Sequence, residues 1–324
     1  MDNQTSVSEF LLLEFSEVRE LQIIHFIFFL VLYFATVTGN LLIIAAVAFD
    51  HHLHTPMYFF LMNLAVQDLG AVSAIIPKSM ANSFMNTRRI SYSGCAAQVF
   101  CFVFFVGSDF FLLTLMAYDR YVAICNPLQY EMVMNRQACM QMIASVWITG
   151  LFYGALHTGS TFAVPFCSNI VNQFYCEIPQ LLRLSCSGSY LTEFAVLAFS
   201  AIIELGCFVF IIATYVLIFT TVLRIPSAQG RQKAFSTCLP HLIVFSIFIF
   251  TGWFAYLRPP SDTPSDLDLA LTVVYTFVPP MLNPLIYSMR NKEMKVALNK
   301  ILLSLCSSME TYVTIFLFSL SVPC

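Results

Sequence analysis

The sequence predicts an all-α membrane protein: a bundle of seven transmembrane helices with an extracellular amino terminus and a short amphipathic cytoplasmic helix after the seventh span. Two observations carry this prediction. Hydrophobic residues make up 59% of the 324 residues and charged residues 10%, with a mean hydropathy of +0.79, whereas soluble domains carry roughly 25% charged residues. The chain also contains seven apolar runs, each about as long as the 20 residues needed to cross a bilayer core.

Leu, Ile, Val and Phe dominate each run. In lipid, a helix satisfies its own backbone hydrogen bonds without water, so each run is expected to be helical. We interpret 1–324 as a single domain, with 1–22 outside the cell, 23–289 as the bundle and 290–324 as the cytoplasmic tail. In chain order, the predicted spans are Ile23–Phe49, Met57–Met80, Tyr92–Cys125, Met140–Gly159, Phe194–Leu223, Ala234–Leu257 and Leu269–Met289.

Charge in the loops predicts the orientation. With the amino terminus outside, nine Lys and Arg residues fall on the cytoplasmic side and six outside, a modest positive-inside bias. Asn3 then begins an accessible Asn-Gln-Thr glycosylation sequon. The net charge of -3, without a basic cluster outside short loops, argues against a nucleic-acid partner.

The third run ends in an acid and an arginine, Asp119 and Arg120, within the stretch Met116–Tyr130. A charged pair is costly in hydrocarbon, so it is expected at the cytoplasmic rim of the helix. We expect Asp119 to hold the Arg120 guanidinium by a charge-assisted hydrogen bond. The alternative is a simple interfacial anchor.

Four of the eleven cysteines differ from the rest because they lie outside the membrane in an oxidising environment. Cys95 opens the third span, and Cys167, Cys176 and Cys186 fall in the long external loop before the fifth. Two disulfides are the economical interpretation, and spacing alone permits three pairings. Crosslinks would make this loop a lid over the bundle.

Five motifs follow one another along the chain: Gly39-Asn40, Leu53–Leu61, Met116–Tyr130, Lys233–Cys238 and Pro280–Tyr287. In this order, each in its expected span, they resemble the olfactory receptors of the rhodopsin-like G-protein-coupled class. The resemblance covers nearly the whole chain.

The resemblance implies an odorant receptor of the plasma membrane that binds a small, largely hydrophobic, volatile ligand and activates a stimulatory olfactory-type G protein, raising cyclic AMP. It also implies the disulfides Cys95–Cys176 and Cys167–Cys186, with Cys95–Cys186 as the alternative. Displacing or protonating Asp119 would free Arg120 to meet the end of a G-protein α subunit in a crevice opened by the sixth span. The resemblance assigns coupling to Asp119, Arg120, Tyr121, Tyr215 and Tyr287.

Three acids fall inside the predicted spans, and each is a functional-site hypothesis because a buried charge is costly there. Asp68 and Asp109 lie at matched depths. We interpret them as a sodium or proton site, the alternative being a structural pair without an ion; the candidate oxygen donors around them are Asn40, Ser108 and Asn283. No other cofactor or metal is predicted.

Glu204 has no partner that the sequence can name. It either faces the ligand cavity, where it would bind a donor group, or bonds to a neighbouring helix, and the second interpretation is favoured. His157 and His241 are interpreted as hydrogen-bonded interior residues rather than metal ligands.

The resemblance places the ligand pocket in the outer half of the bundle, between the third, fifth, sixth and seventh spans. Its predicted lining is apolar and aromatic, as is usual for small-molecule cavities, although an aromatic stripe at helical spacing also fits core packing. Phe102 stands where amine receptors of the wider class keep an acid, which argues against a simple aminergic ligand. The predicted lining residues are Phe102, Val103, Val106, Gly107, Phe199, Ile203, Gly252, Trp253, Tyr256, Val273 and Thr276.

Some positions depart from the family. Phe248-Ile249-Phe250 replaces the usual Phe-Tyr-Gly, and Pro240 stands where a serine is usual, which would shift the pivot of the sixth span. After an amphipathic segment at 291–303 suited to the inner leaflet, the end of the chain, Thr311–Cys324, is uncharged and mostly apolar.

The sequence bears differently on three other functions. A transporter would be expected to show an internal repeat, and none is evident. An enzyme would need a catalytic constellation, and none appears. A chemoreceptor outside the nose for an endogenous metabolite stays open.

Overall fold

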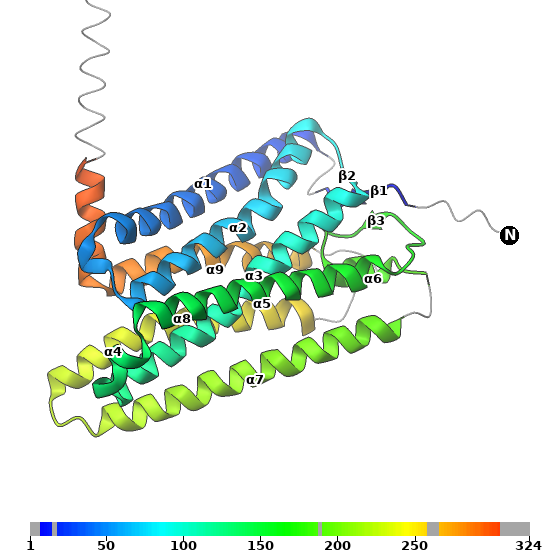
Figure 1. Cartoon of the computed structure of the whole chain (residues 1–324). Coiled ribbons are helices and arrows are strands. Elements are labelled where there is room, and N and C mark those ends of the chain that lie inside the picture. Colours follow the sequence, from blue (N-terminus) through cyan, green and yellow to red (C-terminus); the bar gives the residue numbers. More distant parts are fainter. Residues whose placement is uncertain (1–6, 15–17, 187–189, 258–265, 305–324) are drawn as a thin grey trace, which may run out of the picture.

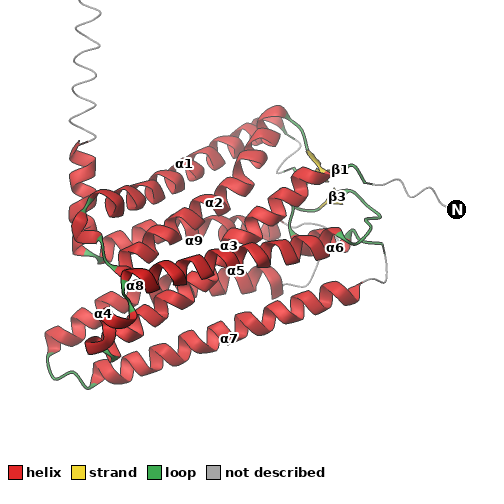
Figure 2. Ribbon diagram, viewed as in Figure 1, coloured by secondary structure: helices red, strands yellow, loops and turns green. Residues whose placement is uncertain are grey.

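The computed structural model describes residues 7–14, 18–186, 190–257 and 266–304. Seven long helices run side by side (Figures 1 and 2), and each contains a stretch long and apolar enough to cross a membrane. The predicted seven-helix bundle is therefore confirmed. The helices are α1 (Arg19–Phe49), α2 (Pro56–Met85), α3 (Tyr92–Cys125), α5 (Arg136–Phe162), α7 (Tyr190–Leu223), α8 (Ala228–Leu257) and α9 (Asp266–Arg290).

Most helices extend beyond the predicted apolar runs, and for α5 a polar side-chain cap marks the new start. The Asn135 side chain accepts a hydrogen bond from the Ala138 N–H, so α5 begins four residues before Met140. Ser91 caps α3 in the same way through the Gly94 N–H, and the bounds of α3 are those predicted. The helix α8 continues through Pro240.

The helix α3 is the centre of the bundle and packs against α2, α5, α7 and α8. Its approach to α5 is close because α5 presents two glycines. A Cβ at Gly150 would lie 1.8 Å from Ser108 Oγ, and one at Gly154 would lie 3.2 Å from the Phe100 carbonyl oxygen. Small residues of this kind let membrane helices pack backbone against backbone.

At one end of the bundle, which we call the sheet end, three short strands form a sheet in the order β2-β1-β3. The strand β1 (Glu9–Leu12) pairs antiparallel with β2 (Arg89–Ser91) and parallel with β3 (Ile170–Val171). The sheet joins the segment before α1 to the loop between α5 and α7, which also contains α6 (Ile178–Arg183). This sheet was not predicted from the sequence.

At the opposite end, which we call the Arg120 end, lie η1 (His51–Leu53), η2 (Pro127–Gln129) and α4 (Tyr130–Val133). A helix at 292–304 follows α9 there and confirms the predicted tail helix (Figure 1). Two contacts hold it: Lys300 Nζ lies 3.0 Å from Asp50 Oδ2, and the Tyr58 hydroxyl donates to Glu293 Oε2 at 2.9 Å.

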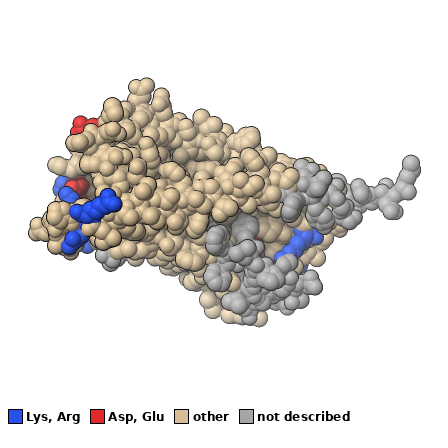
Figure 3. Space-filling view, turned by 90° about the horizontal axis from the view of Figure 1, so that it is seen from below, with Lys and Arg blue, Asp and Glu red and all other residues tan. Residues whose placement is uncertain are grey.

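Charged side chains gather at the two ends, and the flank between them is almost free of Lys, Arg, Asp and Glu where its atoms are visible (Figure 3). This surface pattern is the one expected of a membrane bundle. The predicted glycosylation site Asn3 and the apolar segment Thr311–Cys324 lie outside the described residues.

Candidate functional site

Arg120 is buried inside the Arg120 end of the bundle, with 4% of its surface exposed. Its Nη1 donates to Met57 Sδ at 2.7 Å, at the start of α2. Its Nε is buried without a hydrogen-bond partner among the residues that the structure describes. A thioether is a weak acceptor, so this guanidinium has unused capacity for stronger ones.

Asp119 has a different partner from the one predicted. Its Oδ1 accepts a hydrogen bond from the Tyr130 hydroxyl of α4 at 2.8 Å, and within the described part of the chain no ion pair joins it to Arg120. The expected hydrogen bond between the two is therefore absent, because consecutive helix residues point about 100° apart. Burial and the neighbouring Asp119 carboxyl raise the pKa of Tyr130 well above its usual value, so Tyr130 keeps its proton and remains the donor.

A chain of hydrogen bonds joins α7, α8 and α3 beside Arg120. The Tyr215 hydroxyl lies 2.8 Å from His241 Nδ1, and His241 Nε2 lies 2.9 Å from the Leu113 carbonyl oxygen. Because a carbonyl only accepts, Nε2 donates and Nδ1 of a neutral ring accepts from Tyr215. The interpretation of His241 as a hydrogen-bonded interior residue is confirmed.

The other two predicted coupling residues, Tyr287 and Tyr121, differ in their surroundings. Tyr287 is buried, and its hydroxyl has no partner in the described structure. Tyr121 is partly buried and packs against the main apolar core. The structure thus gathers three buried polar side chains, Arg120, Tyr215 and Tyr287, at one end.

Asp68 lies in the middle of the bundle with 1% of its surface exposed. Asn283 Nδ2 donates to both of its oxygens, at 2.9 and 3.2 Å. Asp109 is also buried, lies close enough to Asp68 for their charges to interact, and has an Oδ1 without a described partner. The structure thus brings together two carboxyls and one of the predicted amide donors.

The other two predicted donors differ. Asn40 Nδ2 donates to the Thr36 and Pro280 carbonyl oxygens, which leaves its Oδ1 buried and without a partner among the described residues. Ser108 instead donates to Phe104 O of its own helix at 2.7 Å and lies against Gly150 of α5. The hydroxyl oxygen of Ser108 keeps its acceptor lone pairs, so its assignment as an oxygen donor to the site stays a prediction. Asp109, Asn40 and Asn283 each have a buried acceptor oxygen with no donor among the described residues. These oxygens fit a small hard cation, which prefers oxygen ligands.

The predicted ligand-binding residues separate into groups. Phe102, Val106 and Val273 pack together in an apolar cluster with Phe174 and Tyr175 of the loop before α6. Val103 packs on a second cluster under the sheet. The Thr276 hydroxyl is buried without a described partner.

The remaining predicted lining residues lie elsewhere or on open faces. Gly107 faces α5, where a Cβ would lie 2.9 Å from the Tyr153 ring. Phe199 is 53% exposed, and Ile203 is partly buried. A Cβ at Gly252 would meet nothing within 4 Å. The side chains of Trp253 and Tyr256 lie outside the described residues.

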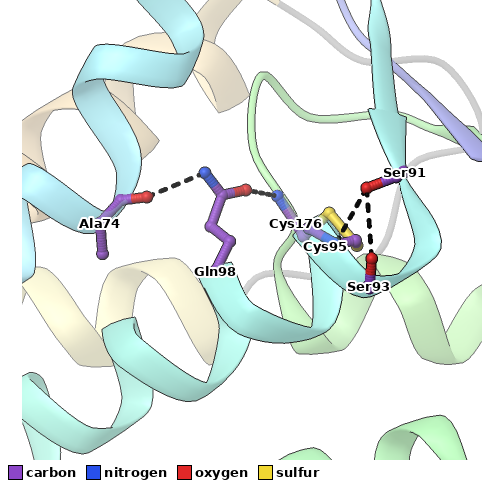
Figure 4. The surroundings of a disulfide bond; sticks show 7 residues. Ala74, Ser91, Ser93, Cys95, Gln98 and Cys176 are labelled. Atoms are coloured by element: carbon purple, nitrogen blue, oxygen red, sulfur yellow. Dashed lines mark hydrogen bonds between the residues drawn. A yellow bond between two sulfur atoms is a disulfide. The ribbon is translucent and has the colours of Figure 1, made fainter.

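The loop between α5 and α7 forms the predicted lid. Its disulfides are Cys95–Cys176 and Cys167–Cys186, which confirms the pairing implied by the resemblance. Figure 4 shows Gln98 of α3 beside the first disulfide, between the lid and α2. Phe174 and Tyr175 extend from the lid into the apolar cluster around Phe102, so the lid fills part of the space expected for a ligand.

A polar latch, not predicted from the sequence, joins the lid to α9. The Tyr275 hydroxyl hydrogen-bonds both the Glu177 carboxylate and the Tyr175 hydroxyl. Gln173 Nε2 donates to Thr272 Oγ1 at 2.8 Å. Burial raises the pKa of Glu177 to about 7. The signal for this latch in the sequence is that Glu177 directly follows the bridging Cys176, because a disulfide fixes its neighbours against the bundle.

Glu204 of α7 accepts a hydrogen bond from the Tyr153 hydroxyl of α5 at 2.7 Å, which confirms the favoured prediction of a bond to a neighbouring helix. One turn away, His157 Nε2 lies 2.7 Å from Ser200 Oγ. His157 is thus also a hydrogen-bonded interior residue, as predicted.

Comparison with known proteins gives matches to olfactory receptors. The family model described as olfactory receptor matches residues 29–305. The chain is 48% identical over 303 residues to human olfactory receptor 14C36, covering 93% of this chain and 97% of that one. It is 50% identical over 299 residues to human olfactory receptor 14I1, covering 92% and 96%. Mouse olfactory receptor 5AP2 is 44% identical over 301 residues, covering 93% and 95%.

Proposed function

We propose that this chain, which belongs to the olfactory receptor family, detects a small, largely hydrophobic, volatile ligand and activates a stimulatory olfactory-type G protein, raising cyclic AMP. The members of this family are multi-pass G-protein-coupled receptors of the plasma membrane and are not enzymes. The observation that carries the proposal is the burial of Arg120 against a thioether, with its Nε left without a partner among the described residues. A guanidinium in this state gains free energy when it meets backbone or carboxylate oxygens of a partner.

The proposed orientation places the sheet end outside the cell and the Arg120 end in the cytoplasm. The excess of Lys and Arg at the Arg120 end supports it. The two disulfides at the sheet end support it as well, because disulfides persist in oxidising environments.

The helix α3 connects the two ends mechanically. Near the sheet end it contributes Phe102 to the apolar cluster under the lid, and at the other end it contributes Arg120. Outward movement of α8 has to break or shift the bond between His241 and the Leu113 carbonyl of α3. We propose that the ligand-bound arrangement favours this movement, which opens a path to Arg120 for the G-protein α subunit.

The buried carboxyls of Asp68 and Asp109 form the proposed sodium or proton site. Two adjacent carboxyls do not both stay ionised without a cation or a shared proton. Asn40 and Asn283 supply the additional oxygens, and their unpaired Oδ1 atoms support the assignment. Sodium in this place would hold α1, α2, α3 and α9 together and favour the resting state.

The test is a cyclic AMP assay in cells that express an olfactory-type stimulatory G protein, screened against hydrophobic volatiles. Arg120→Ala is expected to abolish the response while surface protein remains. The matched control is Arg136→Ala, an exposed arginine at the same end, and it should respond like the unmodified receptor. A response that survives Arg120→Ala would contradict the coupling mechanism.

A further inference from the structure

We propose that Glu204 is the recognition group of a subsite for a ligand with a protonated amine and an apolar chain. This inference rests on the proposed function, because it names the chemistry of a ligand that the receptor would detect. It starts from the position of Glu204 on α7, where a carboxyl lies in a membrane span. Phe102 of α3, which argues against a simple aminergic ligand, is a different position and does not bear on Glu204.

Glu204 lies on the face of α7 that points into the bundle. The buried residues Ser200, Ile211, Tyr215 and Ile218 recur along one side of this helix, and Glu204 follows Ser200 by one turn of about four residues. Unlike them, Glu204 is exposed. Its carboxyl therefore reaches the surface at the seam between α7 and α5, where the Tyr153 hydroxyl contacts it.

The charge of Glu204 is not neutralised within the described part of the chain. Its Oε1 accepts the Tyr153 hydroxyl, and among the described residues no Lys, Arg or His lies within ion-pair distance of it. A carboxylate without a cation is costly at this depth, whereas an ammonium group beside it would favour its charged form. The unmet need is for a cation, which points to an amine rather than to an anion.

The surroundings fit the rest of such a ligand. The Tyr153 ring lies 4.4 Å from the His157 ring in a tilted arrangement and 6.2 Å from Phe111 of α3, measured between ring centroids. Aromatic faces attract ammonium groups. Cys207 and Phe208, three and four residues after Glu204 on the same face of α7, are partly buried and offer apolar surface for a chain. A hydrocarbon amine therefore matches both the charge and the lining.

The test uses the purified full-length receptor in lipid nanodiscs with three probes of equal chain length: octylamine, octanol and octanal. Binding is measured as the rise in thermal-unfolding midpoint with probe concentration, since a ligand of the folded state stabilises it. Octylamine is expected to bind about 10-fold more tightly than octanol, and Glu204→Gln is expected to remove this preference.

Two further variants keep the test decisive if Glu204→Gln lowers the yield. Glu204→Asp retains a carboxylate and should keep the amine preference, and Tyr153→Phe removes only the neutral hydroxyl and should keep it as well. Glu131→Gln, an exposed acid of α4, is the matched control and should not change it. Equal binding of octylamine and octanol, or an amine preference that survives Glu204→Gln, would overturn the inference.

Signalling is scored separately. Amine binding without a cyclic AMP response would contradict the proposed function and leave the subsite standing. A cyclic AMP response to neutral odorants without amine binding would overturn the subsite alone.

Discussion

Gln98 and Cys176 are joined by a hydrogen bond of 2.9 Å, in which the Cys176 N–H donates to Gln98 Oε1. The other end of the same side chain donates from Nε2 to the Ala74 carbonyl oxygen of α2 at 3.0 Å. The amide therefore bridges the lid to α2 beside the disulfide to Cys95 (Figure 4). The lid is held to α3 twice, once covalently and once through this amide.

Replacing Gln98 with Leu should destabilise the receptor. The substitution leaves the Cys176 N–H and the Ala74 carbonyl without their partner, and a buried unpaired group costs about 1–3 kcal/mol. The unfolding midpoint of the purified receptor should fall, whereas Gln137→Leu, at an exposed position of α5, should leave it nearly unchanged. Equal midpoints for the two variants would show that the bridge contributes nothing.

Replacing Gly150 with Val should disrupt the contact between α3 and α5. A Cβ there would lie 1.8 Å from Ser108 Oγ and 3.1 Å from the Phe104 carbonyl oxygen, so the helices have to separate. Overpacking of this kind costs typically about 1–3 kcal/mol, and surface expression measured by flow cytometry should fall. Gly159→Val on the same helix is the control, because its Cβ would meet nothing within 4 Å. Similar loss for both variants would mean that valine itself, and not the close approach, is responsible.

Apolar run length and charge predicted the bundle, because each span is a local property of about 20 residues. Non-local contacts were not predictable in the same way. The pairing of β1 with β2 and β3 joins segments far apart in the chain, and no periodicity in a four-residue strand identifies its partners. The latch between Glu177 and Tyr275 joins residues 98 positions apart.

In the candidate site, too, local features were predictable from the sequence and non-local contacts were not. The disulfide cysteines and the buried acids followed from residue type and topology. The partner of Asp119 did not, because it depends on where the short helix α4 places Tyr130. Gly107 was predicted to line the ligand cavity, but its contact with α5 was not predicted, because spacing alone does not fix the neighbour that a helix residue faces; an added Cβ there would lie 2.9 Å from the Tyr153 ring.

Stability should depend on pH through Glu177 of the lid. Burial raises the pKa of its carboxyl from 4.5 to about 7, so the folded protein binds the proton more tightly than the unfolded chain does. The contribution is fully present below about pH 4.5 and is lost as the pH rises through about 7. The unfolding midpoint of the unmodified receptor should therefore be higher at pH 5 than at pH 8. This difference should be smaller in Glu177→Gln, because glutamine cannot titrate. An identical pH dependence in both proteins would contradict the assignment.

Sodium should stabilise the receptor through Asp68 and Asp109. If the ion binds only the folded state, the unfolding midpoint rises with sodium chloride concentration and does not rise with choline chloride at the same ionic strength, since choline is too large for a site between two buried carboxyls. Asp68→Asn and Asp109→Asn each remove one charge and should abolish the difference between the salts. The matched control, Glu131→Gln, removes an exposed charge at the Arg120 end and should preserve it. If the difference between the salts persists in both Asp variants, the sodium effect arises elsewhere in the receptor. If the two salts stabilise the unmodified receptor equally, Asp68 and Asp109 are a structural pair that shares a proton.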